Sequence, residues 1–161
     1  MTVTAAGPLL VAGIGELVTS ADPHVTLVAY GLGSCIGLAA WDPRTKAAAL
    51  AHFMLPTGQA GGPPVKFVES GFEAFLAGFA AAGGSIRRAQ LKAAGGAAML
   101  SVMVGSLDIG RRNAEAIALQ VGRRGLQLSA SDLGGSSGRT VQLSVADGRL
   151  HVKSVARSTV I

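Results

Sequence analysis

Two short apolar segments, residues 35–41 and 47–55, flank the tetrapeptide Asp42-Pro43-Arg44-Thr45. Asp at the first position and Pro at the second are typical of a type I β-turn. A turn centred on Pro43 and Arg44 joins the two segments into an antiparallel hairpin. The sequence therefore predicts two neighbouring strands of one sheet, and the turn specifies which of their side chains meet.

The hairpin brings together the only cysteine, Cys35, and a histidine seventeen positions later, His52. With the predicted turn, these residues oppose each other across the strands, where Cβ atoms lie roughly 4.5–5.5 Å apart. A free thiol has a pKa of about 8.5, and an adjacent imidazole that takes its proton generates and stabilises the nucleophilic thiolate. The pattern indicates a Cys–His nucleophile pair. The same residues also fit a small buried cysteine beside a structural histidine.

Glycines surround the cysteine in the stretch Gly31-Leu32-Gly33-Ser34-Cys35-Ile36-Gly37. A bare backbone lets a substrate side chain approach the thiol, and the N–H groups near Ser34 and Cys35 are placed to bind a carbonyl oxygen under attack. Gly33 and Ser34 are therefore candidates for an oxyanion loop. Turn formation and close packing explain the same glycines equally well.

The periodicity elsewhere predicts an α/β fold, with a mixed, largely antiparallel strand core and two main helices packed against it. Residues 65–82 repeat phenylalanine at three- and four-residue spacing, which indicates a helix with an apolar core face that Gly83-Gly84 ends. A second helix is expected over 109–123, capped by Asp108 and ended by Gly125. Further strands are expected at 9–18, 24–31, 89–94, 98–104, 126–130, 139–146 and 149–156, the last two joined by Asp147-Gly148.

Length and composition set the expected organisation of the chain. The 161 residues contain no Pro/Ser-rich linker, which predicts a single domain over residues 1–161. Glycine or charge breaks every apolar run before the roughly 20 residues of a membrane span, and the N-terminus lacks the basic region of a signal peptide. One cysteine excludes an internal disulfide and fits a reducing cytosol, so a cytoplasmic location is expected. One cysteine and three dispersed histidines do not have metal-site spacing, and no metal or organic cofactor is expected.

The formal net charge of +5 comes partly from three arginine doublets, Arg87-Arg88, Arg111-Arg112 and Arg123-Arg124. With one Trp and one Tyr, the chain lacks the stacking aromatics of a nucleic-acid surface, and nucleic-acid binding is not expected. Solvated helix ends and loops explain the doublets, and steering toward an acidic partner is the functional alternative. Nothing in the sequence indicates an oligomer, and a monomer is expected by default.

The segment around the cysteine resembles the active-site stretch of CheD, the chemoreceptor glutamine deamidase family of bacterial and archaeal chemotaxis. The family hallmark combines Leu-Gly-Ser-Cys with Ala-His-Phe-Met-Leu-Pro, and these stand here at residues 32–35 and 51–56. Four further blocks match the family in order, so that the resemblance spans about residues 11–153: Gly13-Ile14-Gly15-Glu16, Gly95-Gly96-Ala97-Ala98-Met99, Ile109-Gly110-Arg111-Arg112-Asn113 and Asp132-Leu133-Gly134-Gly135-Ser136-Ser137-Gly138-Arg139.

The resemblance implies a layered sandwich like that of the Cys-His deamidase toxins. It implies deamidation of glutamine to glutamate on the cytoplasmic helices of chemotaxis receptors, through a thioester on Cys35 with His52 as the base. An amine in place of water as the acceptor is left open by the sequence. A second implied function is an adaptor of weak activity that binds and stimulates a CheC-type chemotaxis phosphatase.

One position departs from the family pattern. Family members carry threonine, as a third active-site residue, six positions before the cysteine, and here that position is Ala29. Because such an arrangement is recognised by geometry and roles, a backbone carbonyl is an available substitute for orienting the imidazole.

Overall fold

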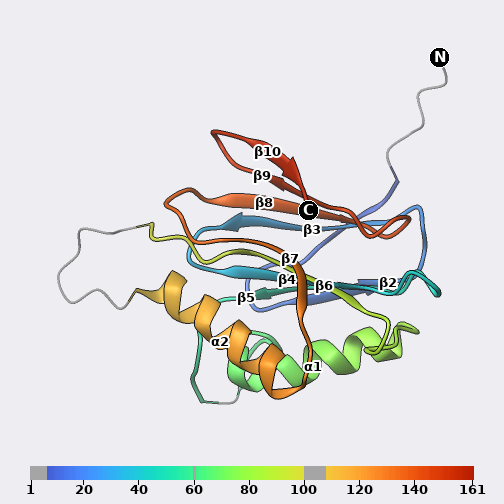
Figure 1. The fold of residues 1–161 in the computed structure, drawn as a ribbon, viewed down its shortest axis with the longest axis horizontal. Coiled ribbons are helices and arrows are strands. Elements are labelled where there is room, and N and C mark those ends of the chain that lie inside the picture. Colours follow the sequence, from blue (N-terminus) through green and yellow to red (C-terminus); the bar gives the residue numbers. More distant parts are fainter. Residues whose placement is uncertain (1–6, 60, 100–107) are drawn as a thin grey trace.

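Two five-stranded sheets stack face to face, and two helices lie on the outer face of one of them (Figure 1). The computed structural model describes residues 7–59, 61–99 and 108–161. The first sheet contains, in spatial order, β1 (Leu9–Val11), β3 (Thr26–Leu32), β8 (Arg139–Ser144), β9 (Leu150–Lys153) and β10 (Ser158–Val160). The second contains β2 (Leu17–Ser20), β5 (Ala48–Phe53), β4 (Ile36–Trp41), β6 (Gln90–Gly95) and β7 (Leu128–Leu133).

The helices, α1 (Val68–Ala81) and α2 (Ile109–Arg123), cover the second sheet, which makes the fold an α/β sandwich of three layers. The β1–β3 and β6–β7 pairs are parallel, and the remaining pairings within the sheets are antiparallel. The predicted α/β class, with mixed and largely antiparallel strands and two main helices, is confirmed for the described residues. The likeness to Cys-His deamidase toxins stays a prediction.

The β4–β5 hairpin lies at the centre of the sandwich and is buried along its whole length. On one face, Ile36 and Phe53 pack in a cluster with the α1 phenylalanines Phe72, Phe75 and Phe79. Alternate residues of the hairpin form a second cluster with the first sheet, whose hairpin members are Ala39, Trp41, Ala48 and Leu50. Burial on both faces explains why these strands are apolar at nearly every position and do not alternate with polar residues.

Both predicted helices are present, and their local signals operate as expected. The phenylalanine stripe of α1 faces the core, and the helix ends before Gly83, whose φ of 100° suits glycine. The Asp108 carboxylate accepts a hydrogen bond of 3.2 Å from the Arg111 N–H and caps α2. Neither helix of the described residues has the length and apolar character needed to cross a membrane.

The prediction of one strand over 9–18 is wrong. The chain leaves the first sheet after β1, crosses at residues 12–16, and enters the second sheet as β2. Gly15 has a φ of 79° and accepts a hydrogen bond of 3.0 Å from the Val65 N–H, so a tertiary contact holds the break. Ala98 and Met99 do not form the strand expected over 98–104, whose remaining residues lie outside the described part of the chain. The short β10 was not predicted.

The predicted hairpin exists, but its register is wrong by two residues. Trp41 pairs with Ala48, and Gly37, not Cys35, pairs with His52. The connection is longer than a two-residue turn because the Lys46 N–H bonds to the Asp42 carbonyl at 2.8 Å. Lys46, the residue after the predicted turn, has a φ of 66° and belongs to the longer connection.

The side chain of Asp42 explains why this longer turn is stable. Its carboxylate is fully buried and accepts hydrogen bonds from the Arg44 N–H at 2.9 Å and the Ser85 N–H at 2.8 Å. The Arg88 guanidinium forms an ion pair with it at 2.7 Å and, together with these N–H groups, holds the pKa of Asp42 well below its usual range. The carboxylate thereby joins the hairpin to the segment after α1.

We expect Asp42→Asn to lower the midpoint of thermal unfolding by several degrees at neutral pH. Since the pKa of Asp42 is depressed in the folded state, the charged form stabilises the fold fully above about pH 5. This contribution is lost as the pH falls below the unfolded value of about 3.9 and through the lower folded-state pKa. Thermal scans across this pH range should show that the difference in unfolding midpoint between wild type and variant becomes smaller toward low pH. Asp22→Asn, in an exposed loop, is the control; a pH-independent gap for Asp42→Asn would contradict the interpretation.

Candidate active site

Cys35 lies at the end of the loop that connects β3 to β4, one residue before β4 begins. It is half-buried and packs against the cluster between the two sheets. Its carbonyl accepts a hydrogen bond of 2.9 Å from the Gly96 N–H, and the Gly33 carbonyl accepts one of 2.8 Å from the Ala97 N–H. The segment that follows β6 therefore bonds to the backbone both at Cys35 and two residues before it.

His52 lies on β5 with only 2% of its surface exposed. Its Nδ1 is 3.1 Å from the carbonyl oxygen of Ala12, in the crossing segment between β1 and β2. Since a carbonyl oxygen only accepts, Nδ1 carries the proton and Nε2 presents a lone pair. Nε2 is buried and has no hydrogen-bond partner among the described residues. The ring is thus anchored at one nitrogen and available for a proton at the other.

The two residues are diagonal neighbours, not directly opposed as predicted. His52 pairs with Gly37, two residues beyond Cys35. Because strand side chains alternate with a period of two, a register shift of two residues leaves both side chains on the same face of the sheet. Diagonal Cα atoms are about 7–8 Å apart, and the side chains of Leu32, Val141 and Leu50 fill the space over the intervening Gly37. The structure therefore corrects the register but keeps the two groups on a common face.

Burial determines the protonation state of this pair. It raises the pKa of the Cys35 thiol, an effect that the residue's own backbone N–H only partly opposes. It lowers the pKa of His52, against the opposing influence of the Ala12 carbonyl and the Glu16 carboxylate. At neutral pH the site therefore holds a neutral thiol and a neutral imidazole. Burial therefore favours the neutral pair over a thiolate–imidazolium pair.

Ala29 is completely buried on β3, in the same inter-sheet cluster that Cys35 packs against. The family pattern has threonine here, and alanine has no group that bonds to the imidazole. The carbonyl of Ala12 bonds to Nδ1 of His52 instead, as expected for a backbone substitute. The departure at Ala29 therefore leaves the imidazole with a partner.

The loop before the thiol contains backbone donors without an acceptor among the described residues. The N–H groups of Ser34 and Cys35 donate to no other residue of the described chain. Met99 lies directly over Gly33, where an added Cβ would come within 2.9 Å of the methionine Cγ. Gly33 thus packs closely against Met99, and the N–H groups of Ser34 and Cys35 are available to donate to a ligand.

Asn113 in the first turns of α2 is a site residue that the sequence reasoning missed. It is fully buried, and its Nδ2 donates to the Ser34 carbonyl at 2.8 Å and to the Met54 carbonyl at 3.0 Å. One side chain thereby ties the loop before Cys35 to the segment after the His52 strand. The available signal was a polar residue four positions before Ile117 on the apolar face of the helix.

Exposed apolar side chains lie in the segments that build the site: Ile14, Tyr30, Met54 and Met99. Beside the Tyr30–Gly31 stretch, the outer face of the first sheet has an open hollow of about 520 Å³. Cys35 and His52 do not line this hollow, because both side chains face the space between the sheets. The hollow and the reactive pair therefore lie on opposite faces of the first sheet.

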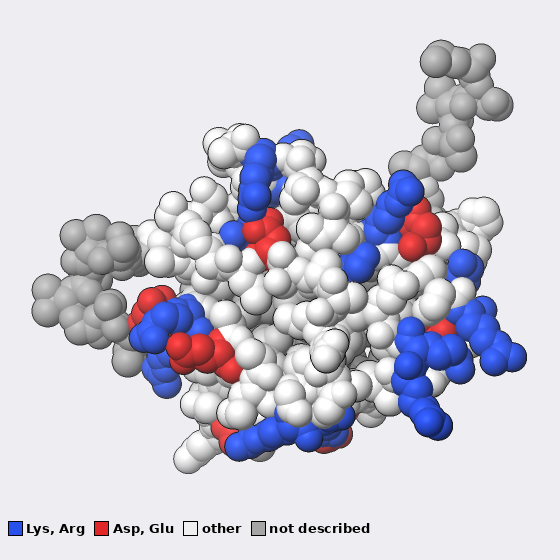
Figure 2. All heavy atoms as spheres, in the orientation of Figure 1, with Lys and Arg blue, Asp and Glu red and all other residues white. Residues whose placement is uncertain are grey.

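Lys and Arg side chains occur in separate groups, several beside Asp or Glu, on the face drawn in Figure 2. One arginine of each doublet forms an ion pair: Arg88 with Asp42, Arg111 with Asp108 and Glu115, and Arg124 with Glu73. Arg111-Arg112 and Arg123-Arg124 lie at the two ends of α2, whereas Arg87-Arg88 lies in the segment after α1, so the doublets occupy helix ends and a loop.

Comparison with known proteins identifies one family. The CheD profile, described as CheD chemotactic sensory transduction, matches residues 54–154. A protein of Symbiobacterium thermophilum named "Probable chemoreceptor glutamine deamidase CheD" is 45% identical over 152 residues, covering 90% of this chain and 92% of the relative. The "Chemoreceptor glutamine deamidase CheD" of Thermotoga maritima is 35% identical over 146 residues, covering 90% and 91%.

Since burial raises the pKa of the Cys35 thiol, we expect iodoacetamide to alkylate the folded protein slowly at pH 7. The rate should keep rising to about pH 9, without the neutral plateau of a preformed thiolate. Intact mass reports the reaction directly, because the chain has one cysteine. The urea-unfolded chain is the control and should react at least about threefold faster at pH 7.5. A plateau below about pH 7 would show that the resting pair is ionised.

Proposed function

This chain belongs to the CheD family, and we propose that it converts glutamine side chains of chemotaxis receptors to glutamate through a thioester on Cys35. The observation that carries the proposal is the state of His52. Its Nδ1 is anchored on a backbone carbonyl, and its unpartnered Nε2 lies on the same sheet face as the only cysteine. A neutral imidazole in this arrangement is a general base for the thiol.

In the first half-reaction, His52 Nε2 takes the thiol proton and the Cys35 sulfur attacks the carbonyl carbon of the glutamine amide. The N–H groups of Ser34 and Cys35 bind the oxyanion, a contribution on the order of 3 kcal/mol per donor in acyl-transfer enzymes. The C–N bond then breaks, His52 returns its proton to the leaving nitrogen, and ammonia departs. The product is a thioester between Cys35 and the former glutamine side chain.

In the second half-reaction, His52 takes a proton from water, and the resulting hydroxide attacks the thioester carbon. The C–S bond breaks, the sulfur regains a proton from His52, and the receptor leaves with a glutamate. One water is consumed and one ammonia released for each glutamine. Each turnover adds one negative charge to the receptor and creates a glutamate that is available for methylation.

The surroundings of the thiol support a protein substrate. Two exposed methionines lie near the loop of Cys35. Met99 contacts Gly33, and Asn113 bonds to the carbonyls of both Met54 and Ser34. Methionine surfaces adapt to the apolar face of a helix. We therefore propose receptor cytoplasmic helices as the partner, and we keep the cytoplasm as the location and a monomer as the working form as further proposals.

Intact-mass spectrometry of a receptor cytoplasmic fragment from the same organism tests the proposal. The wild-type protein should add about 1 Da per modified glutamine, the difference between an amide and an acid, while Cys35→Ala and His52→Ala should add none. His151→Ala is the matched control, because this histidine is exposed on β9 and should be dispensable. No mass gain with folded wild-type protein would contradict the deamidase and favour the adaptor for a CheC-type phosphatase.

Replacing Ala29 with threonine tests whether the family hydroxyl is needed here. Because the Ala12 carbonyl already bonds to Nδ1 of His52, we expect Ala29→Thr to keep kcat within about threefold of wild type. It should lower the unfolding midpoint, because the site is completely buried and must accept two extra atoms. Ala29→Val is the matched control, with the same shape and no hydroxyl. A kcat increase of about tenfold with threonine and not with valine would show that the hydroxyl supplies a missing function.

A further inference from the structure

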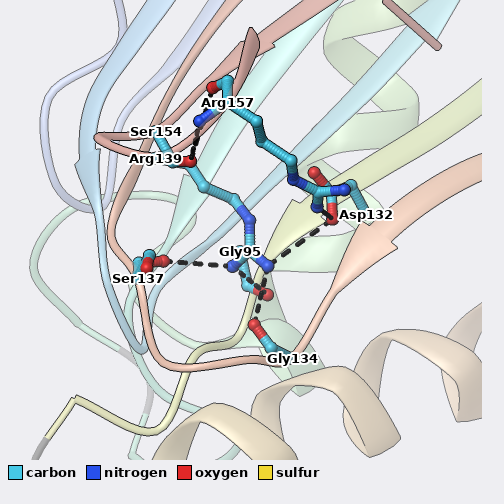
Figure 3. A network of polar contacts seen from close by, with 7 residues as sticks. All are labelled: Gly95, Asp132, Gly134, Ser137, Arg139, Ser154 and Arg157. Atoms are coloured by element: carbon cyan, nitrogen blue, oxygen red, sulfur yellow. Dashed lines mark hydrogen bonds and ion pairs between the residues drawn. The ribbon is translucent and has the colours of Figure 1, made fainter. Parts of the chain in front are cut away.

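A buried guanidinium joins the two sheets at the end of the sandwich that carries Cys35 (Figure 3). Arg139, the first residue of β8, is 7% exposed. Its Nη1 donates to the Gly95 carbonyl at 3.2 Å, and its Nη2 donates to the Gly134 carbonyl at 2.7 Å. A longer bond of 3.4 Å reaches the Ser137 carbonyl. Because burying an arginine is costly unless its donors are satisfied, these carbonyls define one position for the side chain.

Asp132 on β7 holds this arginine in place. Its Oδ1 lies 3.5 Å from Nη2 of Arg139 and 2.6 Å from Nη2 of Arg157. Arg157 comes from the turn between β9 and β10, and Figure 3 shows the carboxylate beside both guanidinium groups. The side chain of Asp132 is 12% exposed, whereas that of Arg157 is 60% exposed. Arg139 is therefore the buried member of the network, and Arg157 closes it from the surface.

The segment that Arg139 binds is the same segment that holds the loop of the nucleophile. The Gly96 N–H donates to the Cys35 carbonyl at 2.9 Å, and the Ala97 N–H donates to the Gly33 carbonyl at 2.8 Å. Gly95 and Gly96 have φ values of 117° and 66°, in the region that glycine favours. Two consecutive glycines do not rigidify a backbone by themselves, so its position depends on contacts from outside the segment.

We propose that Arg139 is a positioning residue for the deamidation reaction. Arg139 fixes the Gly95 carbonyl, and the N–H groups of the next two residues, Gly96 and Ala97, then hold the carbonyls of Cys35 and Gly33. The positions of these two carbonyls set the directions of the Cys35 sulfur and of the oxyanion donors. The inference rests on the proposed function for its kinetic readout. Arg139 acts through the backbone, because its guanidinium donates to the Gly95 and Gly134 carbonyls. A misplacement of about 1 Å in an active site costs on the order of 100-fold in rate.

The Asp42–Arg88 ion pair supplies a matched control. It also joins a guanidinium to a buried carboxylate, at 2.7 Å, and it links two segments that are distant in sequence. Asp42 follows the last residue of β4, whereas Cys35 precedes the first, so the two sites are about 20 Å apart along the strand. Loss of either arginine removes a buried ion pair, but only Arg139 holds the backbone next to the thiol.

The experiment compares Arg139→Gln with Arg88→Gln by kcat and KM on a receptor fragment, by urea unfolding and by the alkylation rate of Cys35. We expect Arg139→Gln to lower kcat at least about tenfold with KM within about twofold, and to change the alkylation rate at least about threefold. Arg88→Gln should lower the unfolding midpoint and keep kcat and the alkylation rate within about twofold. Arg139→Lys should recover part of the lost kcat, since an ammonium still donates to one carbonyl.

Two outcomes would overturn the positioning role. One is an Arg139→Gln protein with kcat within about twofold of wild type; the other is a kcat loss that merely follows the stability loss, as in Arg88→Gln. If Arg139→Gln does not fold, Arg139→Lys and Asp132→Asn provide the same comparison. If the wild-type protein does not deamidate receptors, the proposed function fails, while the alkylation rates still decide whether Arg139 positions the Cys35 loop.

Discussion

Burial of the β4–β5 hairpin on both faces is the constraint on which the rest of the structure depends. Helix α1 covers one face of the hairpin and the first sheet covers the other. A one-residue slip would exchange the two faces, and residues fitted to the helices would then face the first sheet. The hairpin therefore has one register, and this register places Cys35 and His52 on the face between the sheets.

That placement also determines the chemistry available to the pair. Removal from water favours the neutral forms of both groups, so the imidazole begins as a base with a free Nε2. A buried ring needs an anchor for its other nitrogen, and the Ala12 carbonyl provides one. In the mechanism that we propose, His52 therefore accepts the thiol proton as the sulfur attacks the substrate amide.

The sequence predicted best those elements whose signals are local. The phenylalanine spacing of α1 and the Asp108 cap of α2 each lie within a few residues of the structure they specify. It failed where a distant partner decides the local conformation. Asp42 bonds to Ser85 and Arg88 and lengthens the hairpin turn, and the contact of Val65 with Gly15 interrupts the expected first strand.

The candidate site divides in the same way. The sequence alone determined the thiol, the imidazole, their hairpin and, through the period of two, their common face. Only the tertiary structure decided which groups hold them: the Ala12 carbonyl on His52, and Asn113 and Arg139 on the backbone around Cys35. The physical reason is that periodicity and turn residues predict only the local structure, within a few residues along the chain. Hydrogen bonds across the sandwich form between segments whose spacing along the chain carries no such signal.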